Sequence, residues 1–138
     1  MKISAWMGMA LFAFASAAHA AGECDKYSDA YDRTYCFARL FVESDKELNE
    51  VYRELGKRLK ASVRQDLKWT QREWIKYREE TCRTSGDESS IDVDCTHEVN
   101  RARIQYLRDR LRECKAGECR PAAVVQQVPN KPNGYLTI

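Results

Sequence analysis

Apolar residues recur every three to four positions over most of this chain, a spacing that predicts α-helices. The clearest case surrounds the segment 71–82, where one side of a helix would carry Leu67, Gln71, Trp74, Ile75, Arg78 and Cys82. A stripe that only served a core would have leucine where this one has glutamine, arginine and cysteine. The amphipathic pattern therefore predicts a helix whose inner face contains polar groups that need partners.

Two helices are predicted before this segment, over residues 27–42 and 44–59. Ser44 and Glu47 have the spacing of a capping box, which marks the start of the second. The inner stripe of this second helix holds Asp45, Leu48, Tyr52, Leu55, Gly56 and Leu59, with Asn49 at its edge. We expect a break over residues 61–66. Because this stretch has no proline or glycine, one long bent helix is the alternative.

Gly56 is unusual because glycine in the middle of a helix costs about 1 kcal/mol relative to alanine. Its place on the inner stripe indicates either that a neighbouring element approaches closely or that the cost is tolerated.

A last helix is predicted over residues 96–114. Its inner stripe is Asn100, Arg103, Ile104, Leu107, Leu111 and Cys114. The composition of residues 84–90 predicts a loop, and residues 115–118 predict a turn. From residue 120 onward the chain has three prolines and no periodicity, which predicts a flexible tail over 120–138. No strand alternation is present, so the expected fold is an all-α, disulfide-tied bundle of about four helices, over residues 21–119.

The first twenty residues have the three parts of a secretory signal peptide. Lys2 precedes an apolar run, and Ala18-His19-Ala20 resembles a cleavage site. The apolar run is short for a membrane span, although a retained anchor is the alternative. Glu23 occupies the position where a lipoprotein signal requires a small residue, so Cys24 is not expected to carry lipid. The mature protein is therefore predicted to be exported to the periplasm or secreted, without a lipid anchor.

Six cysteines follow the signal peptide, and an even number in a small exported chain predicts three disulfides. Six cysteines allow 15 pairings. We favour the pairs that are local in sequence, Cys24–Cys36, Cys82–Cys95 and Cys114–Cys119. Each would contribute roughly 2–3 kcal/mol, a large share of the stability of a small domain.

The polar residues on the inner stripes require an explanation, because a buried unpaired charge costs several kcal/mol. One hypothesis is an internal network in which Asp45 meets Arg78 or Arg103, and the remaining guanidinium donors reach Asn49, Asn100 or backbone carbonyls. The alternative is that each arginine covers apolar surface with its stem and extends its charged end into solvent.

The same residues resemble a known family. The combination Asp45-x-x-Leu48-Asn49-x-x-Tyr52 with Gln71-x-x-Trp74-x-x-Tyr77-Arg78-x-x-x-Cys82 is similar to the LprI-type lysozyme inhibitor domain. Cys95, Val99, Arg103 and Leu107 continue the pattern, and Cys24 with Cys36 resembles the N-terminal cysteine pair of that family. The resemblance implies an exported helical domain with disulfides between matching cysteines, and inhibition of lysozyme as its activity. The pair Cys114 and Cys119 and the tail are additions to the family pattern.

A catalytic role is not favoured by the residue types present. His97 is the only histidine after the signal peptide, and we expect it to be solvated at a helix start. No nucleophile, metalloprotease or phosphate-binding motif is present. The cysteine spacings do not fit structural zinc or thiol exchange. We therefore expect a protein that is not an enzyme, with no cofactor and no metal.

The net charge and the distribution of charged residues indicate which kind of partner the protein could bind. Without the first twenty residues the formal net charge falls from +2 to +1, so nothing indicates binding to nucleic acid. Asp87, Glu88, Asp92 and Asp94 form an acidic loop, which is a candidate surface for a cationic protein such as lysozyme. Simple solvation of this loop is the alternative. The outer arginines Arg101, Arg108 and Arg112 would instead suit an anionic envelope component. The second functional hypothesis is accordingly an immunity or envelope-maintenance protein with a different partner.

Overall fold

A computed structural model describes residues 21–84 and 90–125. These residues form three long helices and two short ones. The helices are α1 (Ala21–Cys24), α2 (Ala30–Arg58), α3 (Ala61–Thr81), α4 (Val93–Lys115) and α5 (Pro121–Val125). Within the described ranges no strand is present, apart from an isolated bridge between Arg83 and Ile91. The predicted all-α class is confirmed. The proposed signal peptide and most of the predicted loop and tail lie outside the described residues.

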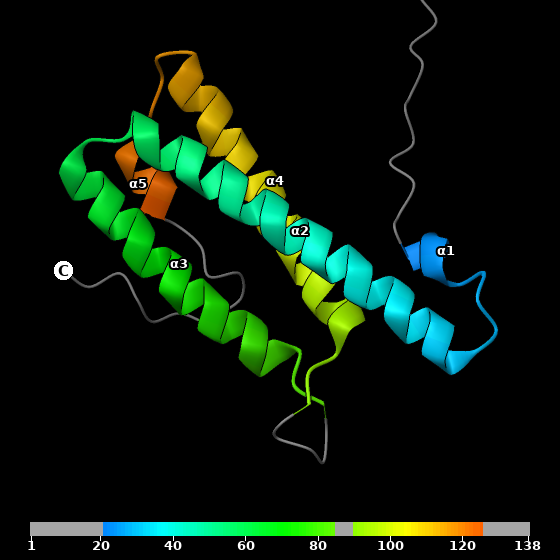
Figure 1. Ribbon diagram of the computed structural model, residues 1–138. Helices are drawn as coiled ribbons and strands as arrows, with labels where there is room; N and C mark the ends of the chain where they lie inside the picture. Colours follow the sequence, from blue (N-terminus) through cyan, green and yellow to red (C-terminus); the bar gives the residue numbers. More distant parts are fainter. Residues whose placement is uncertain (1–20, 85–89, 126–138) are drawn as a thin grey trace, which may run out of the picture.

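The three long helices run up, down and up, so that α2 and α4 lie side by side (Figure 1). The most extensive packing between two helices is that of α2 on α4. α3 runs back along them, and the Cys82–Cys95 disulfide ties the end of α3 to the first turn of α4. α1 lies against the first turns of α2, to which the Cys24–Cys36 disulfide ties it. All three disulfides have the sequence-local pairing that was predicted.

The expected start of a helix at Ser44 is wrong, because α2 continues through it for 29 residues. Ser44 is buried in mid-helix, and its hydroxyl donates to the carbonyl of Phe41 at 2.9 Å. The N-cap is Asp29, whose side chain accepts from the backbone N–H groups of Tyr31 and Asp32. Packing on α4 extends past Ser44 in both directions, which favours an uninterrupted helix over a local capping signal.

The break before α3 is also displaced from its predicted position. Only Leu59 and Lys60 connect α2 to α3, and both are extended, while residues 61–66 are helical. The alternative of one bent helix is therefore wrong as well. Leu59 is buried in the turn, with 6% exposure, so its burial in the core sets the turn in a stretch without breaker residues.

The packed domain extends beyond Cys119, which differs from the expected boundary of the flexible tail. Gly117, with φ of 85°, makes the turn that the Cys114–Cys119 disulfide closes. α5 follows and packs against α3 and α4, and Val124 is 1% exposed in the main core. The hydroxyl of Tyr106 donates to the Ala123 carbonyl and fixes α5 in place.

The apolar interior consists of two clusters. The larger cluster spans α2 to α5 and contains Leu48, Leu55, Leu59, Leu67, Trp74, Ile104, Leu107, Leu111 and Val124. The smaller cluster lies at the start of α2 and contains Cys24, Cys36, Phe37 and Leu40. Along α2, Ser44 and Asp45 fall between the members of the two clusters. A polar layer therefore separates them.

Candidate functional site

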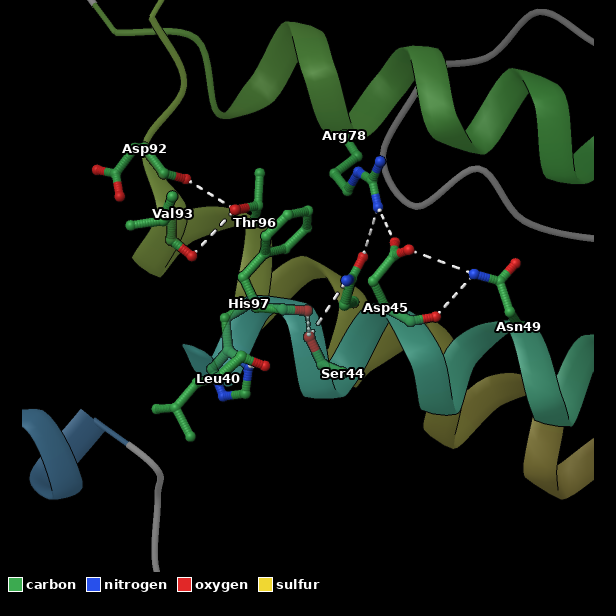
Figure 2. A network of polar contacts seen from close by, with 11 residues as sticks. Leu40, Ser44, Asp45, Asn49, Arg78, Asp92, Val93, Thr96 and His97 are labelled. Atoms are coloured by element: carbon green, nitrogen blue, oxygen red, sulfur yellow. Dashed lines mark hydrogen bonds and ion pairs between the residues drawn. The ribbon is translucent and has the colours of Figure 1, made fainter. Parts of the chain in front are cut away.

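Arg78 joins the three long helices through the polar layer. Its Nη1 donates to Asp45 Oδ1 on α2 at 3.0 Å and to Asn100 Oδ1 on α4 at 2.9 Å. Asn100 is fully buried, and its amide donates onward to Ser44 Oγ at 3.2 Å. The expected pairing of Asp45 with Arg78 is thus present (Figure 2). The guanidinium does not reach solvent as the alternative required, because only 13% of the Arg78 side chain is exposed.

Asn49 does not have the hydrogen-bond partner that was expected. Its amide donates to the carbonyl and the carboxylate of Asp45, at 2.8 and 3.2 Å, one turn back on α2 (Figure 2). Asn49 therefore orients the carboxylate that Arg78 meets and does not itself accept from an arginine.

The Trp74 ring is close to two guanidinium groups. The Arg78 guanidinium carbon is 5.3 Å from the Trp74 ring centre, and that of Arg103 is 5.8 Å away. These are distances for cation–π attraction, which is stronger away from water. Arg103 is 1% exposed, and its Nε donates to Gln71 Oε1 at 3.2 Å. Burial lowers the pKa of Arg103 to about 10, which leaves it charged at neutral pH.

The remaining motif residues also face inward. Leu48 and Leu107 belong to the main core, and Tyr52 and Tyr77 are half-buried against it. The motif residues therefore connect α2, α3 and α4 around Trp74.

His97 is not solvated at a helix start, so that expectation is wrong. It is 6% exposed, and its Nδ1 donates to the carbonyl of Leu40 on α2 at 3.1 Å (Figure 2). The carbonyl can only accept, which assigns the proton to Nδ1. His97 stands three residues before Asn100 and continues the inner stripe of α4, so helical periodicity would have indicated its burial.

The predicted acidic loop is described in part. Asp87 and Glu88 lie outside the described residues, whereas Asp92 and Asp94 begin α4. Asp92 is the N-cap, because its carboxylate accepts from the backbone N–H groups of Asp94 and Cys95 at 3.0 and 3.1 Å. The Cys82–Cys95 disulfide and the Arg83–Ile91 bridge hold the two ends of the loop together. The second half of the loop is therefore fixed to the bundle.

Asp94 carries a charge that its surroundings do not favour. Burial raises the pKa of the Asp94 carboxyl, and the negative charges of Asp92 and Glu98 raise it further. Its Oδ1 atom is buried and has no hydrogen-bond partner. By contrast, the outer arginines of α4 have acidic neighbours: Arg101 lies 3.7 Å from Glu98, and Arg108 contacts Glu47. The acidic end of α4 is thus the less compensated of the two charged surfaces.

In the parts of the chain described here, no group of three or more histidine, cysteine or acidic side chains is arranged to hold a metal ion. Within the same residues, none of the helices combines the length and apolar character needed to cross a membrane.

One family model matches the chain. It is described as lysozyme inhibitor LprI, and it covers residues 24–107, which is more than half of the sequence. The match includes the first two disulfides and the polar layer, and it ends before Cys114 and α5. No curated protein and no solved structure matches this chain.

Proposed function

Since the chain belongs to the LprI lysozyme inhibitor family, we propose that it is an exported protein that binds lysozyme and inhibits it without catalysing a reaction. The observation that carries this proposal is the family match across α2, α3 and most of α4, the helices that the Arg78 network joins.

Export is supported by the covalent chemistry of the domain. The three disulfides engage all six cysteines, and disulfides persist in oxidising compartments outside the cytosol. The residues before Ala21 have the signal-peptide pattern described above. The periplasm or the extracellular space is also where an exported protein would meet a lysozyme.

Inhibition by binding requires a rigid surface that loses little entropy on association. The disulfides and the buried network give this domain such rigidity. Lysozymes are cationic enzymes with a cleft lined by carboxylates, so an inhibitor is expected to present negative charge to the enzyme surface. The acidic end of α4 meets this requirement with Asp92 and Asp94.

A titration of lysozyme activity tests the proposal. Purified oxidised protein, without residues 1–20, is added to a C-type lysozyme, and the lysis of cell-wall substrate is followed. We expect the lytic rate to fall in proportion to the bound fraction, and the effect to weaken as salt is added. An unchanged rate at micromolar excess of the protein would refute lysozyme inhibition and would favour a different partner.

A further inference from the structure

A hollow lies between the first turns of α2 and the start of α4. Its volume is about 380 Å³. It is lined by Ala30, Arg33, Thr34 and Phe37 from α2 and by Val93 and Asp94 from α4. Phe37 is buried in the smaller apolar cluster, and Val93 packs against that cluster. The hollow therefore lies against the smaller apolar cluster, beside the Cys24–Cys36 disulfide.

The hollow has an apolar wall and an acidic edge. Asp92 also lines it, next to Asp94. Among the described residues, neither carboxylate forms an ion pair, and the buried Oδ1 of Asp94 has no hydrogen-bond partner. Arg33 at the rim is exposed and is paired with neither of them. Asp92 accepts two backbone hydrogen bonds as the N-cap, which leaves Asp94 as the less compensated carboxylate. An apolar wall beside this carboxylate suits the aliphatic stem and the charged end of a lysine or arginine side chain.

Exposed aromatic side chains stand on the same turns of α2. Tyr31 is 77% exposed and Tyr35 is 67% exposed. Each tyrosine follows a lining residue, Ala30 or Thr34, by one position, so both lie roughly 100° further round α2, in a stripe on its outer side. Tyrosine is enriched at the energetically important positions of protein interfaces, because its ring buries a large area and its hydroxyl forms hydrogen bonds.

Basic residues gather at the other end of α2, far from the hollow. The end of α2 and the first turns of α3 hold Lys57, Arg58, Lys60, Arg64 and Lys68. α2 has 29 residues, so Lys57 and Arg58 lie roughly 40 Å from the hollow along the helix. A cationic protein would be repelled by this end and attracted by the acidic one.

We propose that the hollow between α2 and α4 is the docking point for a lysine or arginine side chain of a cationic protein partner, and that the surface of this partner also contacts Tyr31 and Tyr35 on the adjoining outer face of α2. This inference rests on the proposed function, which makes a cationic enzyme the partner, and it adds the surface that the enzyme contacts. Arg33 places a positive charge at the rim of the hollow, which weakens the attraction for an incoming cation.

Four variants and direct binding to an immobilised C-type lysozyme test this proposal. Thr34→Lys places the chain's own cation at the hollow, and we expect it to weaken binding at least tenfold. Asp94→Asn should weaken binding about three- to tenfold and reduce its salt dependence. The matched controls are Ser62→Lys and Asp66→Asn, exposed positions on α3 that undergo the same charge changes. Both should bind within twofold of the unmodified protein.

Arg33→Gln supplies a test in the opposite direction. Removal of this positive charge from the rim should strengthen binding about twofold or more, which loss of fold cannot produce. Far-ultraviolet circular dichroism and thermal unfolding establish that each variant is folded.

The outcomes separate the two proposals. If the unmodified protein binds lysozyme and the hollow variants weaken binding while their controls do not, the docking surface is supported. If it binds and inhibits, but Thr34→Lys and Asp94→Asn behave like their controls, the docking surface is refuted and the proposed function stands. If the unmodified protein neither binds nor inhibits, both proposals are refuted together.

Discussion

The contact of Arg78 with two helices leads to a quantitative prediction for Arg78→Met. Methionine keeps most of the aliphatic packing but removes the donor that Asp45 and Asn100 share. Asn100 is fully buried, and a buried acceptor that loses its donor costs about 1–3 kcal/mol. The Asp45 side chain is 40% exposed, so the lost ion pair adds less than about 1 kcal/mol. Loss of the cation–π contact with Trp74 adds about 0.5–1 kcal/mol.

These terms are partly offset, because a guanidinium that is only 13% exposed no longer has to be desolvated. We therefore expect Arg78→Met to lower the free energy of unfolding by about 2–3 kcal/mol. Replacing Asn100 as well should recover part of this loss, since no polar group is then left alone. Arg78→Met with Asn100→Leu should lose about 1–2 kcal/mol less than the sum of the two single variants.

Urea denaturation of the oxidised protein, followed by circular dichroism, measures these differences if the slope against urea concentration is unchanged. Arg72→Met is the matched control, because Arg72 is exposed on the outer face of the same helix. It should change the free energy of unfolding by less than about 0.5 kcal/mol. A neutral or stabilising Arg78→Met would contradict the reasoning and would show that the network contributes nothing to stability.

The remaining predictions concern single positions. Gly56→Ala should stabilise the protein by about 0.5–1 kcal/mol in urea denaturation, because the added Cβ would meet only Arg64 Cγ, at 3.9 Å; a loss would indicate a closer approach. Val124→Ala should destabilise it by about 1.5–2 kcal/mol and lower the thermal midpoint, whereas Ala122→Ser, an exposed change on α5, should leave the midpoint unchanged. The pKa of Asp94 is raised above its ordinary value of 3.8 by burial and by neighbouring negative charges. Between the ordinary and the raised value, the folded state holds a proton that the unfolded state has lost. The free energy of unfolding therefore falls as pH rises from 3.8 through the raised value. Asp94→Asn should therefore be more stable than the unmodified protein at pH 7, and the difference should vanish below pH 3.8; equal stability at pH 7 would show that the carboxylate is compensated.

Helical periodicity was sufficient for the later part of α3 and for most of α4, because each buries one continuous stripe. It failed where tertiary contacts override a local signal. Ser44 and Glu47 have the sequence of a capping box, yet the Ser44 hydroxyl accepts from Asn100 of α4. The turn at Leu59 has no local breaker, because burial of that side chain in the core determines it. Pro121 did offer a signal for α5, since proline is favoured in the first turn of a helix.

The candidate site was less predictable than the fold. Asp92 and Asp94 were singled out by charge alone, and Asp92 proved to be a helix cap as well. The hollow beside them combines residues from α2 and α4 that are about 60 positions apart in the sequence. No local pattern could have joined Thr34 with Asp94, because their proximity depends on how α2 packs on α4.

The residues that identify the family and those proposed to bind the partner are separate sets. Asp45, Trp74, Arg78 and Arg103 face the interior and connect the long helices. The proposed docking surface uses Thr34, Asp94 and the exposed tyrosines, which lie outside the motif. The scaffold nevertheless positions this surface, because the polar layer fixes α4 against α2 directly beside the smaller apolar cluster. A change in the network should therefore alter stability first, and partner binding only where it shifts the start of α4 relative to α2.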